Sequence, residues 1–469
     1  MQRPVLRPRS RRRLHAAALS SVMVAMSLGL ASPSAAQSDE LGVDEISHNK
    51  NIELVANIPR QGPLVNDFHS DMAFWGNYLF QGSYGGINIY NIKHPPKPQL
   101  ITQIHCPGSQ GDVSVSPDGT LLFMSVDSSR SDDSCQSSPL SAANPDAWEG
   151  IRIFDITDIT DPQYIKSVRT DCGSHTHTLV PDDSGDAVYL YVSSYGPNIN
   201  FPNCQPPHDY ISIVEVPLDN PTAAFVVNTP DITPPGVSNF GGCHDITVFP
   251  EGNIAGGACR GDGILFDISD PVNPYVINSV RDPNFAFWHS ATLVNDGQGV
   301  IFTDELGGGG APTCNEAIGP VRGADAIYDI VGEGDDRAMV FRGYYKIPRH
   351  QQNTENCVAH NGMLLPVKGQ AIFVQSWYQG GVSVFDFTDR ENATEIAFFE
   401  RGPLSATSLT LGGSWSAYWY NGYIYSSDII KGLDVLRITG LKGVGSANFD
   451  RLPYLNPQTQ FSYKDTGAS

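Results

Sequence analysis

A unit of four short apolar stretches, separated by turn residues, recurs seven times between residues 51 and 440. The copy at residues 242–276 is the most complete. It opens on His244, turns at a Pro-Glu-Gly-Asn sequence and returns through small residues. Its third stretch ends near Asp267, and a Pro-rich turn leads into the fourth. Repeated units of four short strands are typical of propeller blades. The sequence therefore predicts an all-β fold, a seven-bladed β-propeller.

Two of the four stretches show the repeat clearly. The opening stretch carries histidine at a corresponding place in five copies, and Asp112 or Ser416 in the other two. The third stretch alternates apolar residues and often ends in aspartate. These third stretches lie at residues 86–92, 150–156, 211–216, 264–268, 326–330, 381–387 and 432–438.

The last unit lacks a fourth stretch, because the chain after residue 438 becomes polar and contains proline. A spare apolar stretch, residues 52–58, precedes the first unit and resembles the fourth stretches of the others. We therefore expect this N-terminal strand to complete the last blade. Such closure leaves no free sheet edge between the first and last blades.

At residues 50–440 the sequence resembles a known family. The third stretches resemble LVIVD repeats. The order of the histidine-containing openings, with Thr303-Asp304-Glu305, residues 413–416 and residues 427–429, is similar to exported LVIVD-repeat proteins of the choice-of-anchor B type. The resemblance implies a propeller and assigns no activity. The sequence shows no sorting signal after residue 440, unlike anchored members, so we expect no stable membrane anchor.

The N-terminal residues have the pattern of an export signal. Six arginines precede an apolar run at residues 16–31, and Ser34-Ala35-Ala36 offers a cleavage site before Gln37. Residues 10–14 also resemble a twin-arginine signal, so an ordinary secretory signal and a twin-arginine signal both remain open. Either one predicts a secreted or extracytoplasmic protein.

The predicted organisation follows from these features. Residues 1–36 are a cleaved signal, residues 37–50 a linker, residues 51–440 the propeller and residues 441–469 a polar C-terminal tail. The net charge of −21 argues against nucleic-acid binding, because an acidic surface repels phosphate backbones. We expect a monomer whose partner is a small-molecule substrate or an extracellular ligand.

Eight cysteines, an even number in an exported chain, predict disulfides. Two of them flank one short hairpin at matching distances. Two stand just before openings of adjacent units, two occupy corresponding long loops, and two remain. These relations predict the pairs Cys243–Cys259, Cys106–Cys172, Cys135–Cys204 and Cys314–Cys357. A thiolate metal site is the alternative, although the chain contains no Cys-x-x-Cys.

The histidines of the openings should converge, because the first strand of each propeller blade lines the central channel. Imidazole groups bind copper, iron and zinc, and several meeting at one point form a common site for such an ion. The predicted ligands are His69, His177, His244, His289 and His360. Possible outer partners or additional ligands are His175, Asp112, Asp304, Glu305 and Asp428.

Two functions are consistent with this pattern. The first is a metal-dependent enzyme, with an oxidoreductase favoured, of unknown substrate. The second is a non-catalytic extracellular binding or interaction propeller in which the metal is structural or absent, and the histidines form hydrogen bonds at strand ends. No Gly-x-Ser-x-Gly, His-Glu-x-x-His or phosphate-binding loop is present to suggest another chemistry.

Overall fold

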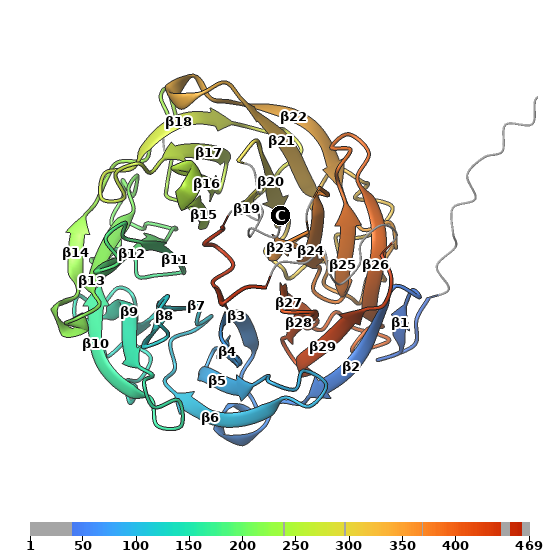
Figure 1. Cartoon of the computed structure of the whole chain (residues 1–469), viewed down its shortest axis with the longest axis horizontal. Helices are drawn as coiled ribbons and strands as arrows, with labels where there is room; N and C mark the ends of the chain where they lie inside the picture. The colour runs from blue at the N-terminus through green and yellow to red at the C-terminus, as the bar shows by residue number, and fades with distance from the viewer. Residues whose placement is uncertain (1–39, 238–239, 295–296, 368, 442–450, 462–469) are drawn as a thin grey trace, which may run out of the picture. The chain divides into compact units, whose positions relative to one another are not determined.

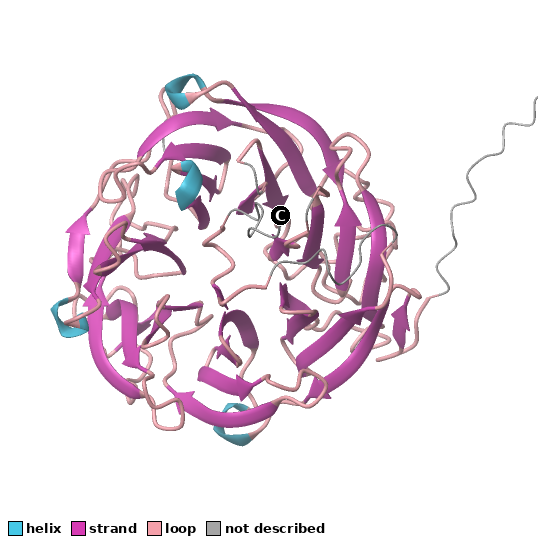
Figure 2. Cartoon of the chain, in the orientation of Figure 1, coloured by secondary structure: helices cyan, strands magenta, loops and turns pink. Residues whose placement is uncertain are grey.

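The computed structural model describes residues 40–237, 240–294, 297–367, 369–441 and 451–461. These residues form seven antiparallel sheets arranged as a ring, which confirms the predicted seven-bladed propeller (Figure 1). Strands and loops make up almost all of the ring (Figure 2). The predicted export signal lies outside the described residues.

Each blade has four strands, numbered along the chain from the axis outward in the first six blades. The strands of blades 1 to 3 are β3 (His69–Trp75), β4 (Tyr78–Ser83), β5 (Gly86–Asn91) and β6 (Gln99–His105); β7 (Val113–Val115), β8 (Leu121–Arg130), β9 (Trp148–Asp155) and β10 (Gln163–Arg169); and β11 (Thr176–Pro181), β12 (Ala187–Ser193), β13 (Ser212–Pro217) and β14 (Phe225–Asn228). Those of blades 4 to 6 are β15 (Asp245–Phe249), β16 (Ile254–Cys259), β17 (Asp262–Asp267) and β18 (Tyr275–Val280); β19 (Trp288–Leu293), β20 (Gly299–Asp304), β21 (Asp325–Val331) and β22 (Ala338–Tyr345); and β23 (Gly362–Leu364), β24 (Ile372–Ser376), β25 (Val382–Asp386) and β26 (Thr394–Arg401).

Blade 7 closes the ring with the two ends of the repeat region. Its inner strands are β27 (Ser414–Tyr420), β28 (Tyr423–Asp428) and β29 (Gly432–Ile438), and its outer strand is β2 (Ile52–Ile58). Strand β2 pairs antiparallel with β29, from Ile52 opposite Ile438 to Ile58 opposite Leu433. The predicted closure is therefore confirmed.

Short elements lie outside this scheme. Strand β1 (Ile46–His48), within the segment expected to be a linker, adds a fifth strand to blade 6 beside β26. Four 3₁₀ helices occupy connecting loops in the part of the chain that the structure describes. They are η1 (Gly62–Leu64), η2 (Pro221–Ala223), η3 (Pro250–Gly252) and η4 (Gly334–Asp336).

The core lies between neighbouring blades. Both faces of a blade pack on other blades, so the inner strands are buried on both sides, as the fully buried β16 and β20 show. Outer strands such as β6 and β18 are only partly buried. Large rings fill the space between blades, with Trp288 and Trp377 almost completely enclosed. This packing fixes the inner strands that carry the candidate site.

Four disulfides connect all eight cysteines, and two of the predicted pairs are correct: Cys243–Cys259 and Cys314–Cys357. The other two pairings were wrong. The chain instead forms Cys106–Cys135 and Cys172–Cys204. In each, a cysteine at the start of a blade binds one in the long loop after that blade's second strand.

The wrong pairing joined equivalent positions of adjacent blades. Packed sheets lie about 10 Å apart, whereas a disulfide joins Cα atoms about 4.4–6.8 Å apart. Buried Arg152 also holds the two partner segments of blade 2 together. Its guanidinium donates to the carbonyls of Pro107 at 2.9 Å and Ser134 at 3.0 Å, beside Cys106 and Cys135.

The C-terminal segment closes one end of the central channel. Residues 453–460, here called the channel plug, cross the axis against the innermost strands, where Figure 1 shows them in dark red. Strand β30 (Tyr454–Leu455) pairs with β3 of blade 1. Asn456 bonds Val115, Thr459 bonds Leu179, and Gln460 bonds Leu293. The plug therefore joins blades 1, 2, 3 and 5, and it also pairs with Val248 of blade 4.

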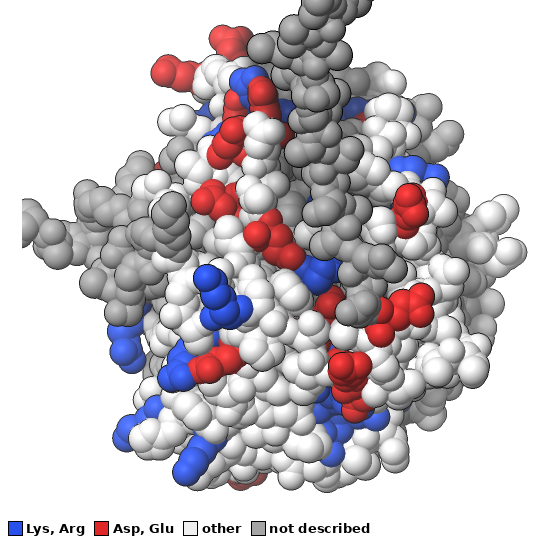
Figure 3. All heavy atoms as spheres, turned by 90° about the vertical axis from the view of Figure 1, so that its right-hand side faces the viewer, with Lys and Arg blue, Asp and Glu red and all other residues white. Residues whose placement is uncertain are grey.

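The outer surface carries both signs of charge. On the edge of the ring in Figure 3, acidic and basic side chains are interspersed among neutral residues. None of the helices among the described residues is long and apolar enough to span a membrane.

Candidate metal centre

Strand pairing identifies which residues occupy equivalent positions around the axis. His244 directly precedes β15 and donates its N–H to the carbonyl of Ala258. His175 makes the same bond to Ser193, and His360 makes it to Ser376. Counting by register in every blade gives a set of seven positions, here called the axial ring. It consists of Ser70, Gly111, His175, His244, His289, His360 and Trp415.

Two of the predicted ligands lie outside the axial ring. His177 lies two residues beyond the ring position of its blade, and His69 lies one residue before its own. The Nε2 and Nδ1 atoms of His177 bond the hydroxyls of Ser114 and Ser125 at 2.7 and 2.8 Å. The structure thus does not bring His177 to the other histidines, and the true ring residue of blade 3 is its neighbour His175.

His69 belongs to the interior of blade 1. Its Nε2 lies 3.3 Å from the side-chain amide of Asn88. A bulge in β3 shifts the pairing between His69 and Met72, so the residue that reaches the ring is Ser70. Burial and the charge of Arg60 lower the pKa of His69 to about 3, which keeps this imidazole neutral. His69 is therefore a structural histidine.

Four histidines from consecutive blades form the cluster. Ring centroids are 4.3 Å apart for His175 and His244, 4.0 Å for His244 and His289, and 4.3 Å for His289 and His360. Glu305, directly after β20, adds a carboxylate. Its two oxygens lie 3.8 Å from Nε2 of His289 and 3.8 Å from Nε2 of His360. One ligand atom from each of His244, His289 and Glu305 lies within 4.8 Å of the others.

Hydrogen bonds at Nδ1 determine where the lone pairs point. His244 donates from Nδ1 to the carbonyl of His289 at 2.9 Å, and His360 donates from Nδ1 to the carbonyl of Trp415. A carbonyl can only accept, so Nδ1 carries the proton in both rings and the neutral Nε2 carries the lone pair. His175 binds Asp127 through Nδ1 at 2.8 Å in the same way. Carboxylate and carbonyl partners of this kind orient metal-binding histidines.

Burial keeps His244, His289 and His360 neutral. It lowers the pKa of His244 and His289 well below the usual value, and the neighbouring imidazoles add to this. Burial also lowers the pKa of His360 to about 3. Burial raises the pKa of Glu305 to about 7, partly opposed by the hydrogen bond from the Tyr378 hydroxyl at 2.6 Å.

These residues fit a metal ion. The Nε2 atoms of His175 and His244 lie only 2.8 Å apart. If both rings are protonated at Nδ1, two lone pairs face each other there, and a cation between them would relieve the repulsion. Nδ1 of His289 has no hydrogen-bond partner among the described residues. Nitrogen and carboxylate ligands in this number suit copper, iron or zinc.

The predicted acidic partners have different roles. Asp304 accepts the N–H groups of Ala286 and Phe287 at 2.9 Å and that of Gly323 at 2.7 Å, so it holds two loops beside Glu305. Asp112 accepts the backbone N–H of His177 at 2.7 Å, and its other oxygen has no hydrogen-bond partner among the described residues. It therefore orients a histidine outside the cluster.

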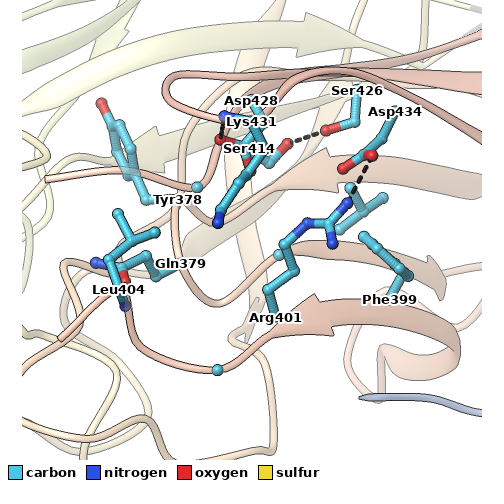
Figure 4. A pocket seen from close by; sticks show the side chains of 14 residues that line it. Tyr378, Gln379, Phe399, Arg401, Leu404, Ser414, Ser426, Asp428, Lys431 and Asp434 are labelled. Carbon is cyan, nitrogen blue, oxygen red and sulfur yellow. Dashed lines mark hydrogen bonds and ion pairs between the residues drawn. The ribbon is translucent and has the colours of Figure 1, made fainter. Parts of the chain in front are cut away.

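Asp428 does not reach the histidine cluster. It ends β28 and accepts the backbone N–H groups of Ile430 and Lys431. Figure 4 shows it in a separate pocket with Arg401 and Asp434, which form an ion pair at 2.7 Å. The sequence did not predict the contact of Asp127 with His175 or that of Tyr378 with Glu305. Asp127 lies on β8 of the neighbouring blade, and only the folded structure brings it to His175. Tyr378 reaches Glu305 from the loop after β24.

A cavity of about 420 Å³ opens above the cluster, and His244, His289, His360 and Glu305 line part of it. Aromatic residues form much of its wall. On the other side of the histidines, a cavity of about 20 Å³ reaches Asp71 and Asp112. The channel plug lies beyond, and Gln458 of the plug donates to Asp71 at 3.2 Å.

No protein-family model and no curated protein sequence matches this chain. Solved structures are similar only in fold. Hydrazine synthase of Kuenenia stuttgartiensis is 11% identical, covering 77% of this chain and 93% of its own, with a TM-score of 0.48. A functionally unknown protein of Desulfotomaculum acetoxidans is 11% identical, covering 74% and 87%, with a TM-score of 0.47. Likeness at this level carries no information on activity.

Proposed function

We propose that this protein is a metal-dependent oxidoreductase acting on a small molecule. The observation that carries the proposal is the convergence of ligand atoms of His244, His289 and Glu305 within 4.8 Å, at the base of a cavity. His175 and His360 lie at the same centre and can add ligands.

The donor set supports a redox metal. Two histidines with one carboxylate and open positions are the ligands of non-haem iron oxygenases, and imidazole also suits copper. When bound, such an ion supplies an open coordination position and electron transfer. The chain's own residues orient the imidazoles through Asp127 and backbone carbonyls, and Tyr378 fixes the Glu305 carboxylate.

The alternative is a non-catalytic binding propeller. It is favoured by the 2.8 Å contact of His175 with His244, which one shared proton could satisfy without any ion. Asp127 would then accept the Nδ1 proton of His175. Metal content, together with whether a bound redox-active ion has an exchangeable ligand, decides between the two proposals.

The experiment is metal analysis of natively produced protein, followed by optical and electron paramagnetic resonance spectra. We expect stoichiometric iron or copper with an exchangeable ligand, and loss of that metal in the double variant His244→Ala/His289→Ala. The matched control is His94→Ala/His105→Ala, which removes two exposed histidines. A wild-type protein without stoichiometric metal would refute the proposal.

Export is part of the proposal. Four disulfides are typical of proteins in an oxidising compartment. Membership of the LVIVD-repeat, choice-of-anchor B type remains a prediction from sequence. N-terminal sequencing of protein recovered outside the cytoplasm should begin at Gln37; an intact N-terminus there would contradict signal cleavage.

A further inference from the structure

The cavity above the candidate metal centre has a polar base and an aromatic wall. Its volume of about 420 Å³ lies within the range of about 300–1,000 Å³ typical of small-molecule sites. Histidines and Glu305 form the base. The aromatic residues of the wall are Phe68, Tyr84, Tyr195, Phe287, Tyr378 and Trp415.

The wall is held rigidly. Phe287 meets the ring of Tyr195 edge-to-face at 5.8 Å, and Tyr378 meets Trp415 in the same way at 6.1 Å. The backbone N–H of Phe287 is fixed by the Asp304 carboxylate at 2.9 Å. Edge-to-face pairs stabilise the orientation of both rings, so the wall is preorganised to contact a flat, apolar ligand.

The charge of the lining argues for a neutral ligand. Among the described residues that line the cavity, none is lysine or arginine. Arg260 lies 5.6 Å from the ring centroid of Tyr195 but does not line the cavity. A carboxylate or phosphate would lose its water here, would gain no cationic side chain, and would meet the Glu305 carboxylate beside the metal. An organic cation would be repelled by a metal ion at the base.

The base offers a place for one polar group. Oε1 of Glu305 already accepts the Tyr378 hydroxyl. Oε2 forms no hydrogen bond with the described residues and lies 3.8 Å from Nε2 of His289. A ligand hydroxyl pointing toward the base can donate its proton to Oε2 of Glu305, while its oxygen offers a lone pair to an ion held by the histidine nitrogens.

We infer that the cavity binds an uncharged planar aromatic molecule that carries a hydroxyl group, with its ring between the aromatic walls and its hydroxyl at Glu305. This inference deepens the proposed function and rests on it for the metal at the base. It identifies the substrate class as hydroxylated aromatics.

The test compares three probes that share a naphthalene ring, by isothermal titration calorimetry on the full protein: 2-naphthol, 2-naphthoate and trimethyl(2-naphthyl)ammonium. We expect 2-naphthol to bind at least about tenfold more tightly than either charged probe. Phe287→Ala should weaken 2-naphthol binding by about tenfold, because one wall is lost. Phe225→Ala, at an exposed ring on the outer strand β14, should have no effect.

Phe287→Leu replaces Phe287→Ala in the test if the alanine variant does not fold. Thermal unfolding of each variant shows whether it is folded. Equal or tighter binding of 2-naphthoate or of the ammonium probe, or no binding of 2-naphthol, overturns the inference. Metal content is measured on the same samples. Metal without 2-naphthol binding refutes the ligand class alone; Phe287-dependent binding without metal supports the ligand class and refutes the proposed function.

Discussion

Nε2 of His175 lies 2.8 Å from Nε2 of His244, across the boundary between blades 3 and 4. The Nδ1 atom of each ring is already engaged, with Asp127 in one case and the His289 carbonyl in the other. The contact therefore needs either a shared proton or a cation. It makes His175, rather than His177, the blade 3 member of the candidate metal centre.

Replacing the two histidines of blade 3 separately should distinguish their roles. His175→Ala should lower metal affinity by at least about tenfold. The variant loses either a direct ligand or the imidazole that orients the ligand His244. His177→Ala should keep the metal. It should instead lower the free energy of unfolding by about 1–3 kcal/mol, because the buried hydroxyls of Ser114 and Ser125 lose their imidazole partner.

Metal titration with a chromophoric chelator measures the first effect, and urea denaturation measures the second. Loss of metal in His177→Ala with normal binding in His175→Ala would mean that the register assigned to blade 3 is wrong.

Metal affinity should depend on pH through Glu305. Burial raises the pKa of this carboxyl to about 7, so at lower pH it must release a proton before it can bind an ion. Affinity should rise with pH through about 7 and then level off. His360, with a pKa lowered to about 3 by burial, does not compete in this range. Glu305→Gln should bind more weakly and lose the step near neutral pH.

Chelator competition at several pH values follows this step, with Glu316→Gln in the loop after β20 as the matched control. An unchanged pH profile in Glu305→Gln would show that another group releases the proton.

The sequence predicted the propeller, its seven blades and its closure because these depend on local alternation of apolar and turn residues. The site was harder to predict, since His69, His177 and the ring histidines look alike in an alignment of openings. Which of these histidines reaches the axial ring depends on the bulge in β3 and on the register of β11. A one-residue shift turns a side chain to the other face of its strand.

The tail was predicted only as polar. Its amide side chains pair with backbone N–H and carbonyl groups at the ends of inner strands, at the floor of the channel. Val115 and Leu293 each form two hydrogen bonds with one amide side chain there. Composition does not distinguish such a segment from a solvated tail, because the contacts join residues far apart in the chain.

The corrected disulfides can be mapped chemically. Non-reducing digestion and mass spectrometry should recover Cys106 with Cys135 and Cys172 with Cys204. Replacing Cys172 and Cys204 together by serine should lower the free energy of unfolding by about 2–4 kcal/mol, as expected for opening a loop of this length. Recovery of Cys106 with Cys172 would contradict the structure.

Stability should fall as pH rises through the range in which Asp71 is protonated only in the folded protein. Burial and the charge of Asp112 raise its pKa from 3.8 to about 8. Between these values the folded protein binds a proton that the unfolded chain releases, so the free energy of unfolding decreases with pH. Asp71→Asn should make this slope shallower.

Urea denaturation across this pH range provides the measurement. Asp183→Asn, at an exposed turn, should keep the wild-type slope. Equal slopes in all three proteins would show that Asp71 is ionised in the folded state.

The channel plug should contribute to stability through its amide side chains. Asn456 accepts the N–H of Val115 and donates to its carbonyl, both at 2.8 Å and both buried. Asn456→Ala leaves these two backbone groups unpaired, which costs about 1–3 kcal/mol each. Urea denaturation should therefore show a clear loss, whereas Asn392→Ala, at an exposed turn, should change little. Because the plug closes the channel opposite the cavity, metal content should stay unchanged in Asn456→Ala. Equal stability of the two variants would mean that the plug does not stay bound at the channel floor in solution.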